Sequence, residues 1–166
     1  MIRRCFLLSL TALLLHGCSP QKSTYDAKYY LVRHAEKTTE KHDPGLTDEG
    51  QQRAQDLADR FAKVSLTAIY SSDYIRTRDT AAPVAAAKGL DITIYDPRDL
   101  ESLAKTLLAQ QGQFLIVGHS NTTPELSRRL GGLEGEPIVE ATEYNRLYVL
   151  FRRGQQIISR IEPYGD

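Results

Sequence analysis

Short apolar runs typical of β-strands alternate with helical segments from residue 28 onwards, and this alternation limits the chain to few folds. Residues 114–117 are apolar at every position, as in a strand that is buried on both faces of a sheet. We expect strands at 28–33, 67–71, 92–95 and 114–117, and helices at 47–61, 74–88, 98–110 and 124–130. The pattern predicts a three-layer α/β fold with a largely parallel sheet.

The last part of the chain has a different pattern. Residues 145–151 and 156–162 are both β-rich, and they flank Arg153-Gly154. Two such runs around a glycine-containing turn predict an antiparallel hairpin at the end of the fold. We expect Tyr144, Tyr148 and Phe151 to pack within this part of the sheet.

Length and charge narrow the functional classes. A chain of 166 residues favours a single domain of ordinary size. Lys+Arg 21 balances Asp+Glu 21, so the formal net charge is zero. A general nucleic-acid-binding protein normally carries a basic surplus, and we therefore expect no nucleic-acid partner.

The N-terminus has the features of a secretory signal. Arg3 and Arg4 precede the apolar run 6–15, which is too short to cross a bilayer. The run ends in Leu15-His16-Gly17-Cys18, which is similar to the cleavage box of bacterial lipoproteins. Residues 1–17 are thus predicted to be a lipoprotein signal peptide, with Cys18 lipidated after cleavage. An ordinary signal peptide or an uncleaved anchor is the alternative.

These features divide the chain into three parts. After the signal peptide, residues 18–27 carry the lipidated cysteine and a polar tether, and 28–166 form the folded domain. The lipid is the only membrane attachment that we expect, and the domain would face the periplasm. Ser19 after the cysteine favours the outer membrane over the inner, by analogy with lipoproteins. Cys5 and Cys18 are the only cysteines, so the domain has no disulfide and no thiol nucleophile.

Charged and polar residues follow three of the expected strands. Arg33-His34 ends the first strand, Ser71-Ser72 and then Arg76 follow the second, and Gly118-His119-Ser120 follows the run 114–117. Ligands of parallel sheets bind beyond the carboxyl ends of the strands, so we expect these residues to converge at one edge.

The converging side chains suit phosphoryl chemistry. Two guanidinium groups can hold a tetrahedral oxyanion through paired hydrogen bonds. One imidazole that is neutral at one ring nitrogen can attack phosphorus. A second imidazole, held protonated by the bound anion, can stabilise the charge that builds on the phosphoryl oxygens. This set needs no metal ion and no organic cofactor.

Four motifs resemble those of the histidine phosphatase superfamily, which has the phosphoglycerate-mutase-like fold. The motifs are Leu31-Val32-Arg33-His34-Ala35-Glu36, the segment 46–54 (LTDEGQQRA), the segment 71–81 (SSDYIRTRDTA) and Val117-Gly118-His119-Ser120. They occur in the family's order, and the compact phosphohistidine-phosphatase branch has a similarly short design.

The resemblance implies a role for each matching residue. His34 would be the nucleophile that becomes phosphohistidine, and Arg33 and Arg76 would bind the phosphate. His119 would complete the pocket, and Ser120 would add its backbone N–H. The implied activity is hydrolysis of a phosphomonoester or phosphoramidate.

The general acid is less clearly marked. Larger family members carry a glutamate in a long insertion after the third strand, whereas here one helix fills the space between the expected strands 92–95 and 114–117. Glu101 is our preferred acid, with Asp99 or no protein residue as alternatives. So short an insertion implies an open site. A phosphorylated small molecule, an envelope glycan or lipid, or a phosphoprotein could then bind, and the natural substrate is left open.

Other functions fit the sequence less well. Gly118-His119-Ser120 resembles the start of a serine hydrolase's nucleophile elbow, but Thr122 stands where that motif needs glycine. The chain lacks the paired-histidine spacing of a metal enzyme. A phosphoglycerate-mutase-like transferase and a non-catalytic phosphate-binding lipoprotein remain as alternatives. The oligomeric state and the final membrane leaflet are not predicted.

Overall fold

The computed structural model describes residues 25–165. The predicted signal peptide, Cys18 and most of the tether lie outside the described residues. Within them, a six-stranded sheet has the order β3-β2-β4-β1-β5-β6. Its strands are β1 (Ala27–Arg33), β2 (Ala68–Ser72), β3 (Ile92–Tyr95), β4 (Gly112–Gly118), β5 (Arg146–Arg153) and β6 (Gln156–Pro163). The helices are α1 (Asp48–Arg60), α2 (Ile75–Lys88), α3 (Leu100–Leu108) and α4 (Thr122–Arg129).

Four strands run in parallel and the last two form the predicted hairpin. β4 pairs in parallel with both β1 and β2, and β2 pairs in parallel with β3. β5 is antiparallel to β1 and to β6. The predicted α/β fold with a largely parallel sheet and a C-terminal antiparallel hairpin is therefore confirmed.

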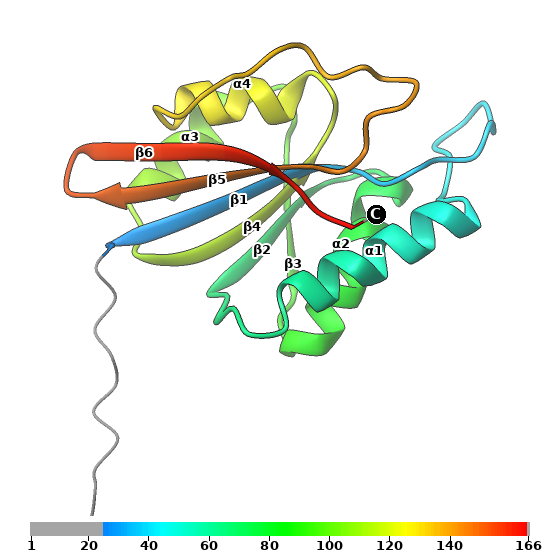
Figure 1. Cartoon of the computed structure of the whole chain (residues 1–166), viewed down its shortest axis with the longest axis horizontal. Coiled ribbons are helices and arrows are strands. Elements are labelled where there is room, and N and C mark those ends of the chain that lie inside the picture. The colour runs from blue at the N-terminus through cyan, green and yellow to red at the C-terminus, as the bar shows by residue number, and fades with distance from the viewer. Residues whose placement is uncertain (1–24, 166) are drawn as a thin grey trace, which may run out of the picture.

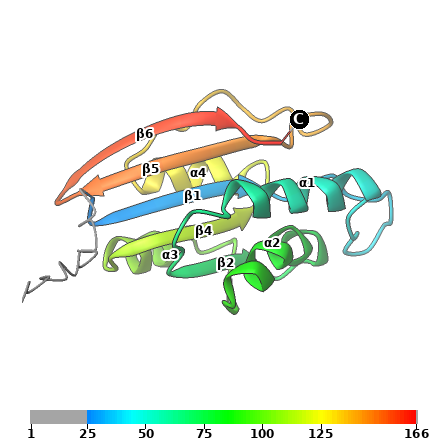
Figure 2. The same ribbon diagram turned by 60° about the horizontal axis from the view of Figure 1, so that its bottom comes forward.

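Helices cover both faces of the sheet, which gives three layers (Figure 1). α1 and α2 pack together on one face, and α3 and α4 lie on the other (Figure 2). Each face has its own core because side chains alternate along a strand. In β4, Phe114 and Ile116 pack towards α3 and α4, whereas Leu115 and Val117 pack towards α1 and α2.

The element boundaries follow local chemistry. Thr47 caps α1 by accepting a hydrogen bond from the Gly50 backbone N–H at 3.1 Å. A Cβ at Gly50 would lie 2.2 Å from the Glu36 carbonyl oxygen, so only glycine lets α1 approach the loop that follows β1. α3 starts later than the predicted 98–110 because Asp99 caps it, accepting from Ser102 N–H, and it ends at Leu108.

Two loops reach the carboxyl ends of the parallel strands. Residues 34–47 join β1 to α1, and residues 130–145 join α4 to β5. The first loop lies at the opposite end of the sheet from the start of β1 and from the β5–β6 turn (Figure 1). The second begins beside that turn, where Leu130 and Gly131 line a cavity with Gly154 and Gln155, and then runs along α4 to the other end (Figure 1). Within residues 25–165, no helix is both long and apolar enough for a membrane crossing.

Candidate active site

The four Arg and His side chains expected at one sheet edge do lie together. The His34 and His119 rings have centroids 5.6 Å apart. Arg76 Nη2 is 3.4 Å from His119 Nδ1. The topology explains this arrangement, because β4 lies between β1 and β2 and all three strands run in the same direction.

His34 is fixed by its backbone and presents one ring nitrogen to the site. Its N–H donates to the Gly118 carbonyl at 2.9 Å, and the next N–H, of Ala35, donates to Thr80 Oγ1. His34 Nδ1 lies 2.7 Å from the Ala35 carbonyl oxygen, which cannot donate, so Nδ1 carries the proton. Nε2 then has a lone pair, and within residues 25–165 no group hydrogen-bonds to it.

The surroundings of His34 keep its ring neutral. The residue is 3% exposed. Burial, reinforced by the charges of Arg33 and Arg76, lowers the pKa of His34 to about 3. The imidazole is therefore unprotonated at Nε2 near neutral pH, the form that a nucleophile requires.

Arg33 is a buried cation with unused donors. It is 1% exposed, and burial lowers the pKa of its guanidinium below the usual value. Nη1 donates to the Glu143 carbonyl at 3.0 Å, and the Tyr144 ring lies 4.1 Å from the guanidinium carbon. Nε and Nη2 have no hydrogen-bond partner among the described residues. Unpaired buried donors are costly, so this guanidinium is arranged for an acceptor that comes from outside.

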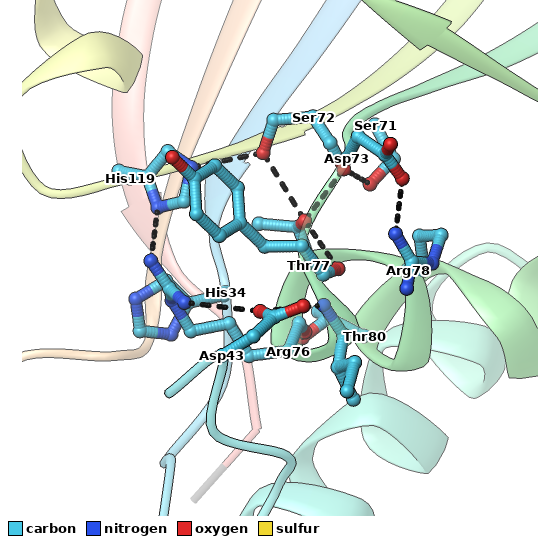
Figure 3. A network of polar contacts seen from close by, with 12 residues as sticks. His34, Asp43, Ser71, Ser72, Asp73, Arg76, Thr77, Arg78, Thr80 and His119 are labelled. Atoms are coloured by element: carbon cyan, nitrogen blue, oxygen red, sulfur yellow. Dashed lines mark hydrogen bonds and ion pairs between the residues drawn. The ribbon is translucent and has the colours of Figure 1, made fainter. Parts of the chain in front are cut away.

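His119 is held through both of its ring nitrogens. Ser72 Oγ lies 2.9 Å from Nε2, and Arg76 approaches Nδ1 (Figure 3). Ser72 Oγ also donates to Thr77 Oγ1 at 3.1 Å. Burial first, and then the charges of Arg76 and Arg33, lower the pKa of His119 to about 4.

Arg76 stands in the first turn of α2, where the positive end of the helix dipole disfavours a cation. Asp43, from the loop after β1, offsets this. Its carboxylate accepts from the Ile75 N–H at 3.0 Å and lies 3.6 Å from Arg76 Nη1 (Figure 3). The Tyr74 ring lies 4.5 Å from the Arg76 guanidinium carbon and 4.9 Å from the His119 ring. Nε of Arg76 has no hydrogen-bond partner within residues 25–165.

His34, Arg76 and His119 line a cavity of about 560 Å³, and the buried Arg33 lies behind this lining. Ser120 lines it beside His119, as expected. The described residues that line the cavity are His34, Lys37, Tyr74, Arg76, Pro97, Arg98, His119, Ser120, Asn121, Thr122 and Glu140. Glu140 supplies the only carboxylate among them, 4.0 Å from Arg33 Nη2.

The two carboxylates predicted as general acids lie elsewhere. Glu101 is on the outer side of α3, where its Oε2 pairs with Arg129 Nη1 of α4 at 2.5 Å. Asp99 caps the same helix. Neither belongs to the cavity lining. The turn into α3 directs both side chains away from the anion-binding groups, so the structure offers no geometry for the predicted acid role.

Sequence patterns missed several groups of the site. Tyr144 does not simply pack within the sheet: its ring covers the Arg33 guanidinium and lies 6.2 Å from the His34 ring. Tyr148, in contrast, is buried in the core as predicted. Asp43 and Glu140 come from loops, whose course no periodic pattern reveals. Ser72 carried a signal, because it lies in the motif 71–81 at the end of a strand.

Among the described residues, no group of three or more His, Cys, Asp or Glu side chains is arranged to hold a metal ion. Arg33 and Arg76 carry positive charge beside the two imidazoles, and Lys37 and Arg98 add positive charge in the cavity lining. The arrangement can therefore bind a tetrahedral anion and place a neutral imidazole nitrogen against it.

Comparison with known proteins agrees with this geometry. Residues 29–100 match the family model described as Histidine phosphatase superfamily (branch 1). A "Probable phosphoglycerate mutase GpmB" from Escherichia fergusonii is 42% identical over 76 residues, which are 42% of this chain and 35% of that protein. The chain thus spans about a third of the length of such curated relatives.

Solved structures share the fold at low sequence identity. One is a putative phosphohistidine phosphatase, SixA, from Agrobacterium tumefaciens, with TM-score 0.57 and 24% identity over 86% of this chain and 99% of that one. Another is YhfR from Bacillus stearothermophilus, with TM-score 0.64 and 18% identity over 82% of this chain and 96% of that one. A protein histidine phosphatase SixA complexed with tungstate reaches TM-score 0.65 at 14% identity, over 82% of this chain and 96% of the other.

Proposed function

We propose that the protein is a phosphohydrolase of the histidine phosphatase superfamily, a proposal supported by the match of residues 29–100 to the model of its branch 1. It transfers the phosphoryl group of a phosphomonoester or phosphoramidate to His34 and then to water. Phosphoryl transfer depends mainly on positioning and charge neutralisation. Two guanidinium groups and two imidazoles supply both, so the proposed reaction needs no metal ion.

The main support for this proposal is that Arg33 is buried and keeps two N–H donors unpaired among the described residues. A guanidinium that is 1% exposed keeps Nε and Nη2 unpaired, among the described residues, beside an imidazole whose Nε2 is also free. Nε and one Nη form the fork that matches two oxygens of a phosphoryl group. An anion bound there satisfies the two donors and brings its phosphorus close to His34.

The proposed reaction has two steps. In the first, His34 Nε2 attacks phosphorus while Arg33, Arg76 and His119 stabilise the charge on the phosphoryl oxygens. In the second, water attacks the phosphohistidine and releases inorganic phosphate and free His34. The Ser120 N–H, next to His119 at the rim, adds a further donor to the bound anion.

Names of similar proteins suggest the substrate class. Proteins with this fold include a mycobacterial glucosyl-3-phosphoglycerate phosphatase and a phosphoserine phosphatase from Entamoeba histolytica, besides the SixA protein histidine phosphatases. We propose a phosphorylated small molecule or phosphoprotein as the substrate here. The cavity volume of about 560 Å³ leaves room for a large leaving group.

The proposed location is the cell envelope. The N-terminal sequence predicts lipidation at Cys18, and β1 begins at Ala27, at the opposite end of that strand from Arg33. A tether attached there would direct the cavity away from the membrane and towards the periplasm. Incorporation of labelled palmitate into the wild-type chain, with none in Cys18→Ser, tests the anchor. Equal labelling of both chains rules it out.

Trapping of the covalent intermediate tests the proposed activity. The protein is mixed with 4-nitrophenyl phosphate in the presence of a chelator, quenched at alkaline pH and mapped by mass spectrometry. We expect nitrophenol release and a phosphoryl group on His34. His42→Gln serves as the control because His42 lies exposed in the loop after β1. Release of nitrophenol without phosphorylated His34, or no release at all, contradicts the proposal.

A further inference from the structure

The site contains two imidazoles and two guanidinium groups, but none of these four groups can readily protonate the leaving group. Nitrophenolate leaves phosphorus readily, whereas an alkoxide needs a proton as it leaves. His34 and His119 have pKa values lowered to about 3 and about 4, so neither ring is a ready acid near neutral pH. The donor for an alkyl phosphate must come from another group in the cavity.

Glu140 has the position that such a donor needs. It lies in the loop between α4 and β5, and among the described lining residues it is the only carboxylic acid. Its Oε1 is 4.0 Å from Arg33 Nη2, one of the two unpaired donors of that guanidinium. A phosphoryl group held by Nη2 therefore lies within reach of the Glu140 carboxyl.

Glu140 also lies where a leaving group has space. It lines a neighbouring cavity of about 310 Å³ on the other side, together with Ser120, Asn121, Pro124 and Ile138. The two cavities meet at Ser120, Asn121 and Glu140. A substrate whose phosphate sits at Arg33 can extend its alcohol part into the second cavity, which puts the bridging oxygen next to Glu140.

Other carboxylates near the site are already engaged. Asp43 is held by the Ile75 N–H and by Arg76. Glu143 is paired with Arg146 and accepts from the Val139 N–H. The Glu36 carboxylate faces Arg53 at 2.7 Å, away from the cavity. The Glu140 side chain, in contrast, is 71% exposed and, within residues 25–165, has only the distant contact to Arg33.

We infer that Glu140 is the general acid and base of this site, an inference that rests on the proposed phosphatase function. In the first step the His34 Nε2–phosphorus bond forms, the phosphorus–oxygen ester bond breaks, and the Glu140 proton moves to the leaving oxygen. In the second step water attacks phosphorus and gives its proton to Glu140, and the electron pair of the breaking bond returns to His34.

Leaving-group dependence tests this inference. kcat/KM is measured for the wild type and Glu140→Gln on 4-nitrophenyl phosphate, phenyl phosphate and an alkyl phosphate. We expect a loss of less than about 3-fold on the nitrophenyl ester and of about 100-fold or more on the alkyl ester, in line with general-acid contributions. The high-pH limb of the kcat profile on phenyl phosphate should disappear in the variant.

Two further variants make the test specific. Glu136→Gln changes an acid of the same loop that lies outside the catalytic cavity, and it should behave like the wild type on all three esters. Inhibition by vanadate should be no weaker in Glu140→Gln, because the carboxylate donates nothing to the anion. Glu101→Gln tests the sequence prediction directly.

Each outcome decides the inference. A uniform loss on all three esters in Glu140→Gln contradicts it, and so does leaving-group dependence in Glu101→Gln instead. If the wild type hydrolyses none of the esters, the proposed function fails and the inference fails with it. If the wild type is active and Glu140→Gln is unchanged on the alkyl ester, only the inference fails.

Discussion

The site consists of two Arg–His halves that have the same composition but differ in how they are held. Arg33 and His34 come from the end of β1, are almost fully buried, and keep Nε, Nη2 and the imidazole Nε2 unpaired among the described residues. Arg76 and His119 come from α2 and the end of β4, and both nitrogens of the His119 ring are engaged. The first half has two N–H donors and an imidazole nitrogen available to a substrate. In the second half, hydrogen bonds within the protein already hold the imidazole in position.

The two tyrosines repeat this pairing. Tyr144 covers the guanidinium of Arg33 and lies near His34, and Tyr74 does the same for Arg76 and His119. Each ring excludes water from one guanidinium face, which strengthens the electrostatic interactions of that half. The difference between the halves therefore lies in hydrogen bonding rather than in aromatic cover.

Replacement of the two histidines should show the largest functional difference between the halves. His34→Gln should lower kcat by at least about 10⁴-fold and form no phosphoenzyme, because the nucleophile is lost. His119→Gln should lose about 10²- to 10³-fold, as expected for a donor to developing charge, and still form phosphohistidine. Rapid quench with radiolabelled substrate measures both. Phosphoenzyme in His34→Gln, or its absence in His119→Gln, would reverse the assignment of the halves.

Replacement of Arg33 should impair anion binding more than replacement of Arg76. Arg33→Lys removes a fork with two unpaired donors and should weaken vanadate inhibition about 100-fold, whereas Arg76→Lys should weaken it about 10-fold, in line with one lost charge-assisted hydrogen bond. Thermal melts of both variants check that the fold survives. Equal losses would show that the halves bind the anion alike.

Low pH should reduce the stability of the protein without bound anion, because His34 and His119 both have lowered pKa values in the folded state. Their pKa values are about 3 and about 4 in the folded chain, against 6.5 for an unperturbed imidazole, so the unfolded chain binds more protons between these values. The free energy of unfolding therefore falls as pH decreases from about 6.5 towards 3 and loses no more from these groups below that.

Denaturant titrations at pH 7 and pH 5 measure this effect. The His34→Gln/His119→Gln double variant should lose less stability over this interval than the wild type. Saturating phosphate should also reduce the loss, because a bound anion favours the protonated imidazoles. An identical loss in the wild type and the double variant would mean that the rings are not held neutral.

Neighbouring serines allow the smallest and most specific test. Ser72 and Ser71 are both buried, but Ser72 Oγ contacts His119 and Ser71 Oγ donates to the Ser72 carbonyl. Ser71→Ala loses one buried hydrogen bond and Ser72→Ala loses two, to His119 and to Thr77, at about 1 kcal/mol of stability for each bond. Ser72→Ala alone should also lower kcat about 5-fold, with a shifted acid limb of the pH profile. Equal kinetics in both variants would mean that Ser72 does not position His119.

The difference between strand ends and loops explains what the sequence could predict. Arg33, His34 and His119 follow apolar strands directly, and the parallel topology brings strand ends together without a need for fine register. Those three, and Arg76 at the start of a helix after a strand, were predictable for this reason. Ser72, at a strand end as well, carried the same signal.

The groups that sequence patterns missed lie on irregular segments. Glu140 and Tyr144 come from the loop after α4, and Asp43 comes from the loop after β1. Their positions depend on loop conformation, which has no periodicity to read. Glu101 follows β3 in the chain, but the turn capped by Asp99 directs it to Arg129 instead of the cavity. Sequence proximity to a strand end was misleading there, because Glu101 lies in the first turn of α3 and its side chain points towards α4.

A crystal structure with bound vanadate tests the central claim, that the two halves enclose one tetrahedral anion with His34 as the nucleophile. We predict vanadium bonded to His34 Nε2. Its oxygens should accept from Nε and Nη2 of Arg33, from Arg76 and from His119. Vanadium bonded to His119, or an anion bound with both Arg33 donors still unpaired, would contradict the claim.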